Sequence, residues 1–142
     1  MEVNVGIKQI SVFLENSAGR LSDVTKTLAK AGINLRAISI ADTHDFGILR
    51  LIADKTDEAV SALTGAGFTM RLTDVAAVVI EDIPGSLANL LELFQKSGIN
   101  IEYLYASLEG INGKAVVVFK LEDNEKGLKI LKESGLTLTD RL

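Results

Sequence analysis

The chain has 142 residues, no cysteine, one histidine and a formal net charge of −4 at pH 7. A chain without cysteine has no disulfide, thiolate metal site or cysteine nucleophile. The chain is acidic overall and lacks the clustered basic residues that a nucleic-acid-binding face needs. The first residues do not resemble a signal peptide, and no apolar run approaches the roughly 18 residues of a membrane span. We therefore expect a cytoplasmic protein without nucleic-acid or membrane partners.

In the first half of the chain, the spacing of apolar residues alternates between that of a strand and that of a helix. Apolar residues occupy every second position near its start, as in a half-buried strand. From Gly19 they follow the helical spacing, and Gly32 ends that helix by accepting a left-handed conformation. The apolar stripe of the helix is Leu21, Val24, Leu28 and Ala31. The predicted elements are a strand at 8–15, a helix from 19, strands at 33–41 and 46–53, a helix from 57 and a strand at 68–72.

The second half predicts the same order of elements, βαββαβ. They are a strand at 75–80, a helix with Leu87, Leu90, Leu91 and Phe94 on one face, strands at 99–106 and 114–121, a helix capped by Asp123 and a strand at 136–138. The repeated order predicts two domains, 1–73 and 74–142, and because only Thr73 and Asp74 separate them, we expect one compact pseudo-symmetric body. A βαββαβ unit closes most simply as a ferredoxin-like sandwich, with two helices on one face of an antiparallel sheet.

Two short motifs occur twice at one offset. Gly19 and Gly85 each stand at the start of a predicted helix, 66 residues apart, and Asn34 and Asn100 repeat the same spacing. Internal repeats determine the architecture of a chain. These repeats indicate two related half-domains with a glycine-bearing helix start and an asparagine at matching points.

The repeated helix starts are candidate anion sites. A helix N-terminus has unpaired N–H groups and a partial positive charge, and glycine lets a ligand approach the backbone closely. The asparagine amide both donates and accepts, which suits the ammonium and carboxylate groups of an amino acid. Both motifs are also ordinary turn chemistry, so a purely structural role remains the alternative.

No catalytic or metal-binding constellation is evident in the sequence. His44 stands in a predicted turn between Asp42 and Asp45, without another histidine or a cysteine nearby to mark a metal site. No serine has an identifiable base partner. We expect no enzyme activity of its own, no metal and no cofactor. A small enzyme on a ferredoxin-like scaffold stays open as the third alternative, after a structural or protein-interaction module without a ligand.

The repeated motifs resemble those of ACT domains. The second loop is similar to the family's D/N-x-P-G-x-L loop, and residues 98–101 are similar to its G-x-N-I strand start. The first half matches at residues 16–21 and 32–35, except that Ala18 replaces the usual proline. The resemblance covers residues 8–138 as two tandem ACT domains.

The resemblance implies a non-enzymatic, allosteric regulatory protein that binds a small molecule, an amino acid, at the interface between its two domains. It implies two sandwiches packed side by side through their second strands with a shared antiparallel sheet, a homodimer, and a regulated metabolic enzyme as partner. Each loop would meet the asparagine of the other half. The implied ligand-binding residues are Asn16, Ser17, Ala18, Gly19, Arg20, Leu21, Asn34, Asp82, Ile83, Pro84, Gly85, Ser86, Leu87 and Asn100.

Overall fold

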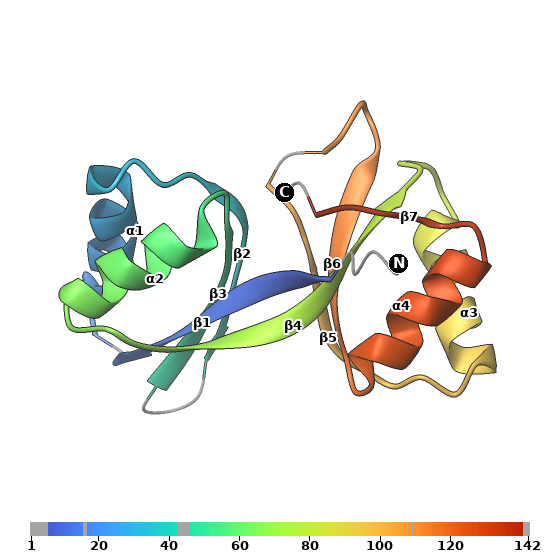
Figure 1. Cartoon of the computed structure of the whole chain (residues 1–142), viewed down its shortest axis with the longest axis horizontal. Coiled ribbons are helices and arrows are strands. Elements are labelled where there is room, and N and C mark those ends of the chain that lie inside the picture. Colours follow the sequence, from blue (N-terminus) through green and yellow to red (C-terminus); the bar gives the residue numbers. More distant parts are fainter. Residues whose placement is uncertain (1–5, 16, 43–45, 109, 141–142) are drawn as a thin grey trace. The chain divides into compact units, whose positions relative to one another are not determined.

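The computed structural model describes residues 6–15, 17–42, 46–108 and 110–140 of the chain (Figure 1). They divide into two compact units, residues 8–73 and residues 74–140 with residues 6–7. Asn16 and His44 lie outside the described residues. Among the described residues, no helix is long and apolar enough to cross a membrane.

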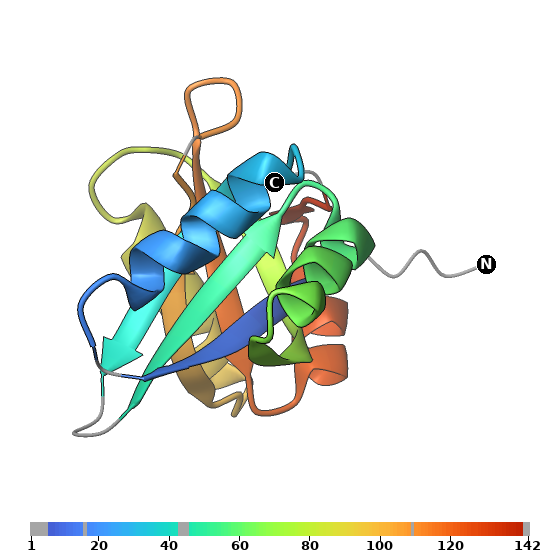
Figure 2. The same ribbon diagram turned by 90° about the vertical axis from the view of Figure 1, so that its left-hand side faces the viewer.

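The first unit has the predicted order of strands and helices. Its elements are β1 (Ile7–Glu15), α1 (Arg20–Lys30), β2 (Leu35–Asp42), β3 (Phe46–Ala53), α2 (Thr56–Gly65) and the start of β4 (Thr69–Ile80). The sheet runs in the order β2-β3-β1-β4, in which β1 and β2 are both antiparallel to β3. Figure 2 shows α1 and α2 over the same face of this sheet. This order and layering are those of a ferredoxin-like sandwich.

The second unit repeats the pattern. It uses the rest of β4, then α3 (Ser86–Lys96), β5 (Ile101–Ala106), β6 (Ala115–Leu121), α4 (Asn124–Glu133) and β7 (Thr137–Leu138). The strand order β5-β6-β4-β7 matches that of the first unit. The predicted α+β class and the duplicated βαββαβ order are therefore confirmed. Packing of the two units through their second strands stays a prediction.

The repeat extends to an irregularity in the strands. The pairing of β2 with β3 shifts register between Leu35 and Ala37, and the pairing of β5 with β6 shifts between Ile101 and Tyr103. Each shift follows directly after the repeated asparagine. A shift of this kind adds a residue to one strand and bends it locally, so the asparagines begin equivalent, bent strands.

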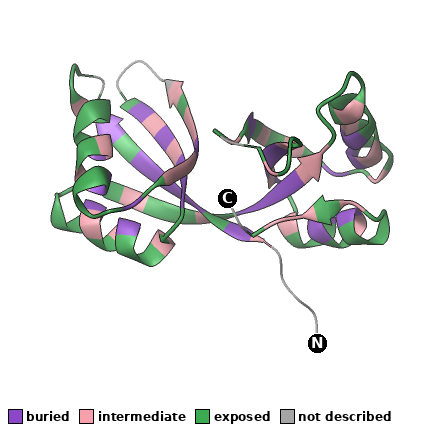
Figure 3. Cartoon of the chain, turned by 90° about the horizontal axis from the view of Figure 1, so that it is seen from above, coloured by how far each residue is buried: buried purple, intermediate pink, exposed green. Residues whose placement is uncertain are grey.

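Each unit has its own hydrophobic core between its helices and its sheet. Val24, Leu28 and Leu63 of the first pair of helices meet Ile10 and Leu49 of the strands. The matching core of the second unit contains the side chains Leu90, Phe94, Leu131, Val117 and Phe119. Figure 3 shows many of the buried residues on the strands and many exposed residues on the helices. Apolar burial of this kind is the main stabilising term for each unit.

Two details of the sequence-based prediction were wrong. The separate strands expected at 68–72 and 75–80 are one continuous strand, β4, because the residues between them, Thr73 and Asp74, include neither glycine nor proline and the extended backbone continues. The apolar stripe of the first helix is also shorter than expected, since Val24 and Leu28 are buried whereas Leu21 and Ala31 are exposed.

Candidate functional site

The two glycine-bearing helix starts have nearly the same backbone geometry. Gly19 precedes α1 with φ +89° and ψ −11°, and Gly85 precedes α3 with φ +92° and ψ −14°. This left-handed region is open to glycine and strained for most other residues. A Cβ atom at either position would meet no atom within 4 Å. Glycine is therefore required by the backbone conformation, and the space beside both helix starts is open.

Among the described residues, no side chain accepts the first backbone N–H groups of either helix. No side chain caps α1 or α3, whereas the carboxylate of Asp123 accepts the Lys126 N–H of α4 at 3.0 Å. Within the described ranges, no acceptor is recorded for the N–H groups of Leu21 and Ser22 or for the matching pair Leu87 and Ala88. Unpaired N–H groups at a helix start bind anions such as a carboxylate.

The two helix starts differ in the charge beside them. Arg20 opens α1, where its guanidinium lies 4.8 Å from the ring centroid of Phe68 and its Nη1 lies 3.5 Å from the Asp23 carboxylate. The start of α3 has no acidic residue in its first turn, and its loop begins with the exposed Asp82. The first helix start therefore has the paired charges of Arg20 and Asp23 beside it, and the second has the carboxylate of Asp82, so we expect different ligand preferences.

Apolar side chains are exposed beside both helix starts. Leu21 is 41% exposed, Leu87 is 36% exposed and Ile83 is 64% exposed. Helical periodicity predicts Leu21 and Leu87 on the core side, but both lie in the first turn of their helices and are exposed. Each helix start thus combines free backbone donors with apolar surface, which is the usual composition of a small-molecule site.

The repeated asparagines anchor one strand to the next through their backbones. Asn34 donates its N–H to the carboxylate of Asp54 at 3.0 Å and accepts the Asp54 N–H at 3.0 Å. Asn100 accepts the Glu122 N–H at 3.0 Å in the same way. Asn34 and Asn100 are both exposed. The asparagines thus have a structural role that the sequence did not reveal.

The structure does not bring the helix start and the asparagine of one half together. Gly19 and Asn34 flank opposite ends of α1, an 11-residue helix, and such a helix is roughly 16 Å long. Gly85 and Asn100 flank the equally long α3 in the same way. A ligand that contacts both a loop and an asparagine must therefore take the asparagine from another half.

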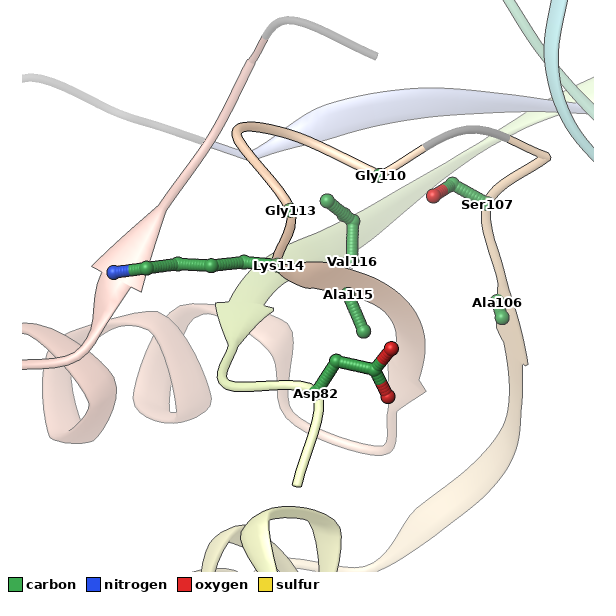
Figure 4. A pocket seen from close by; sticks show the side chains of 8 residues that line it. All are labelled: Asp82, Ala106, Ser107, Gly110, Gly113, Lys114, Ala115 and Val116. Atoms are coloured by element: carbon green, nitrogen blue, oxygen red, sulfur yellow. The ribbon is translucent and has the colours of Figure 1, made fainter.

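A recess in the second unit was not predicted. It has a volume of about 380 Å³ and lies where Asp82 meets the end of β5 and the start of β6. Figure 4 shows the Asp82 carboxylate and the Ser107 hydroxyl directed toward this space, and the Lys114 side chain extending away from it. The recess is formed by Asp82 and by residues of the hairpin between β5 and β6, which are distant from Asp82 in the sequence, so the loop motif alone could not have indicated it.

The described part of the chain offers no cluster of three or more histidine, aspartate or glutamate side chains that could hold a metal ion.

Comparisons with known proteins agree with this fold. The family model described as an ACT domain pair matches residues 5–140. Among solved structures, protein BT0572 from Bacteroides thetaiotaomicron shares 41% identity and a TM-score of 0.88, over 94% of this chain and 92% of that one. The ligand-free regulatory subunit of aspartate kinase from Thermus thermophilus shares 19% identity and a TM-score of 0.64, over 89% and 91% of the two chains. A search of curated proteins found no match.

Proposed function

Because the chain belongs to the ACT domain pair family, we propose that it is a non-catalytic regulatory module that binds an amino acid. The carboxylate of the ligand would lie on the free N–H groups at the start of α1 or α3. The observation that carries the proposal is the duplicated, uncapped helix start with glycine in the left-handed conformation. A purely structural turn would account for one such helix start, whereas the chain has this start at equivalent points of both halves.

The proposal includes a polar contact from an asparagine of the other half. Asn34 would complete the site at the second loop and Asn100 the site at the first. Each amide would donate to or accept from the polar groups of the ligand. The separation of loop and asparagine by a whole helix supports this exchange, since one half cannot supply both groups to one small ligand.

A regulatory role requires a protein that responds to the bound ligand. We propose a metabolic enzyme as this partner and a homodimer as the assembly. Solved regulatory subunits of aspartate kinase share the fold at 19% identity, and fold alone does not transfer their partner. Ligand binding would favour one arrangement of the module over another through differential affinity, which is the physical basis of a regulatory signal.

The first test is a thermal-shift screen of the full chain against the common amino acids. A ligand at 100 times its dissociation constant adds roughly 2.7 kcal/mol, which raises the melting temperature of a small domain by several degrees. We expect a saturating response to one or a few amino acids, with micromolar to millimolar affinity, because a free amino acid has few atoms to bury. No response to any amino acid would favour an interaction module, for which the exposed Leu21, Ile83 and Leu87 would be the contact surface.

The second test removes one asparagine side chain. Asn34→Ala should weaken binding of the amino acid found in the screen by about 1–3 kcal/mol, the cost of leaving a polar group unpaired. The free protein should keep its melting temperature, since both hydrogen bonds between Asn34 and Asp54 use the Asn34 backbone. Calorimetric titration measures the affinity, and unchanged affinity in both Asn34→Ala and Asn100→Ala would remove the asparagines from the proposed sites.

A further inference from the structure

The hairpin between β5 and β6 ends in a tight turn at Asn112 and Gly113. The Ile111 N–H donates to the Lys114 carbonyl at 3.0 Å, and the Lys114 N–H donates to the Ile111 carbonyl at 2.9 Å. Asn112 has φ +51° and Gly113 has φ +77°, and Asn112 is the one described residue other than glycine with a positive φ. Two positive φ angles in a two-residue hairpin loop are typical of a type I′ turn.

Asparagine followed by glycine is the dipeptide most prone to deamidation, and the chain contains it once, at Asn112. Glycine has no Cβ atom, so it leaves its own backbone nitrogen unhindered. Asn112 and Gly113 are both exposed. Within the described ranges, no acceptor is recorded for the Gly113 N–H and no hydrogen-bond partner for the Asn112 side chain. Both reacting groups are therefore accessible to water.

We propose that Asn112 is a deamidation site and that the closed hairpin protects it. In the reaction, the Gly113 nitrogen attacks the side-chain carbonyl carbon of Asn112, so that a new C–N bond forms and the bond to the side-chain amino group breaks. The amide proton of Gly113 leaves with that amino group as ammonia, and a five-membered succinimide remains. Water then opens the succinimide at either carbonyl, which gives aspartate or isoaspartate. The reaction needs no co-reactant besides water.

The geometry of the turn opposes closure of the succinimide ring. The five ring atoms lie nearly in one plane, so the Gly113 nitrogen and the Asn112 Cβ must be eclipsed about the Cα–C bond of Asn112. In a type I′ turn the first central residue has ψ of about +30°, which places these two atoms on nearly opposite sides of that bond. The reaction therefore requires local opening of the hairpin, as in other exposed segments of folded proteins.

Packing beside the turn keeps the hairpin closed. Gly110 lies so close to the Lys114 carbonyl oxygen that a Cβ atom would overlap it, and the same oxygen accepts the Ile111 N–H. Figure 4 shows Gly110 and Gly113 around the recess that both residues line. Isoaspartate at position 112 would lengthen the main chain by one carbon, so the two-residue loop would no longer fit and the recess would change shape. The inference needs no ligand and does not rest on the proposed function.

The test is peptide mapping by mass spectrometry of the full chain after incubation at mildly alkaline pH, once in buffer and once unfolded in urea. Deamidation replaces an amino group by a hydroxyl group and raises the mass of the peptide that contains Asn112. We expect deamidation to be at least about tenfold faster in urea, because a minor open state makes up at most about 10% of the folded chains. Equal rates in buffer and urea, or an intact Asn112 in urea, would each overturn the inference.

Gly110→Ala tests the protection in the folded chain without changing the reacting residues. Its methyl group would displace the Lys114 carbonyl, so amide hydrogen exchange at Ile111 and Lys114 should become faster, and deamidation with it. The matched control Gly65→Ala adds the same group where no atom lies within 4 Å, and it should change neither rate. Faster exchange with unchanged deamidation would overturn protection by the hairpin, and unchanged exchange would overturn the role of Gly110.

Discussion

At the scale of single residues, Gly85 is required for its backbone conformation. Its φ of +92° lies in the left-handed region, where an L-residue with a Cβ atom costs about 1–2 kcal/mol. We therefore predict that Gly85→Val lowers the free energy of unfolding by at least about 1 kcal/mol, measured by urea denaturation. A Cβ atom there meets no neighbour, so the loss would come from strain and not from a clash.

Gly65→Ala is the control for this prediction. Gly65 is the last residue of α2, and a Cβ atom added there also meets no neighbour, but its φ is not positive. Alanine at such a position is neutral or stabilises by about 0.4–1 kcal/mol through the unfolded chain. Equal destabilisation by Gly85→Val and Gly65→Ala would contradict the explanation from backbone strain.

The repeated glycines could be predicted from the sequence, because their spacing places them at helix starts whatever the tertiary structure. The exposure of Leu21 and Leu87 could not be predicted from the sequence. Helical periodicity gives the side of a helix on which a residue lies, but it does not give how far the sheet extends beneath that residue. The recess beside Asp82 needs residues 24 or more positions away along the chain, which only the folded structure brings together.

At the scale of elements, α4 is the one helix in the described ranges whose capping side-chain bond was predicted and observed. Asp123 accepts the Lys126 N–H at 3.0 Å. Loss of such a cap typically costs about 1 kcal/mol. We predict that Asp123→Ala lowers the free energy of unfolding by about this amount and that Asp123→Asn largely retains it, as measured by urea denaturation. Glu122→Ala, one residue earlier and exposed, should change it by less than about 0.5 kcal/mol.

Packing of α3 on its sheet depends on one aromatic pair. Phe94 is fully buried, and its ring centroid lies 5.3 Å from that of Phe119 in an edge-on arrangement with an interplanar angle of 66°. We predict that Phe94→Ala costs about 3–5 kcal/mol through the cavity it leaves. Gln95→Ala, exposed on the same helix, should cost less than about 0.5 kcal/mol. A loss below 1 kcal/mol for Phe94→Ala in thermal denaturation would mean that α3 is not held by this contact.

Most helices and strands could be predicted because the spacing of their apolar residues and the residues that begin and end them are local features of the sequence. The continuity of β4 was not predicted. The turn propensity of Thr73 and Asp74 is weak, and the extended backbone continues through both residues. The bent starts of β2 and β5 were also missed. They depend on pairing register with β3 and β6, which the sequence of one strand does not contain.

At the scale of the whole molecule, the chain is a duplicated fold whose two copies differ in charge at equivalent points. Arg20 at the first helix start corresponds to Ser86, and Asp82 before the second corresponds to Asn16. Duplication preserves the backbone geometry of the two helix starts. Under the proposed function, these starts would hold the carboxylate of the ligand, and the side chains that differ would select its other groups. One chain can thus combine two related sites with different preferences.

The central claim is that an amino acid binds through the free backbone donors at the helix starts. The most direct measurement is an amide NMR titration of the full chain with the amino acid that raises its melting temperature. The account predicts saturable shifts for the amides of Leu87 and Ala88, of Leu21 and Ser22, or of both pairs. Saturable binding that leaves all four signals unshifted would contradict it.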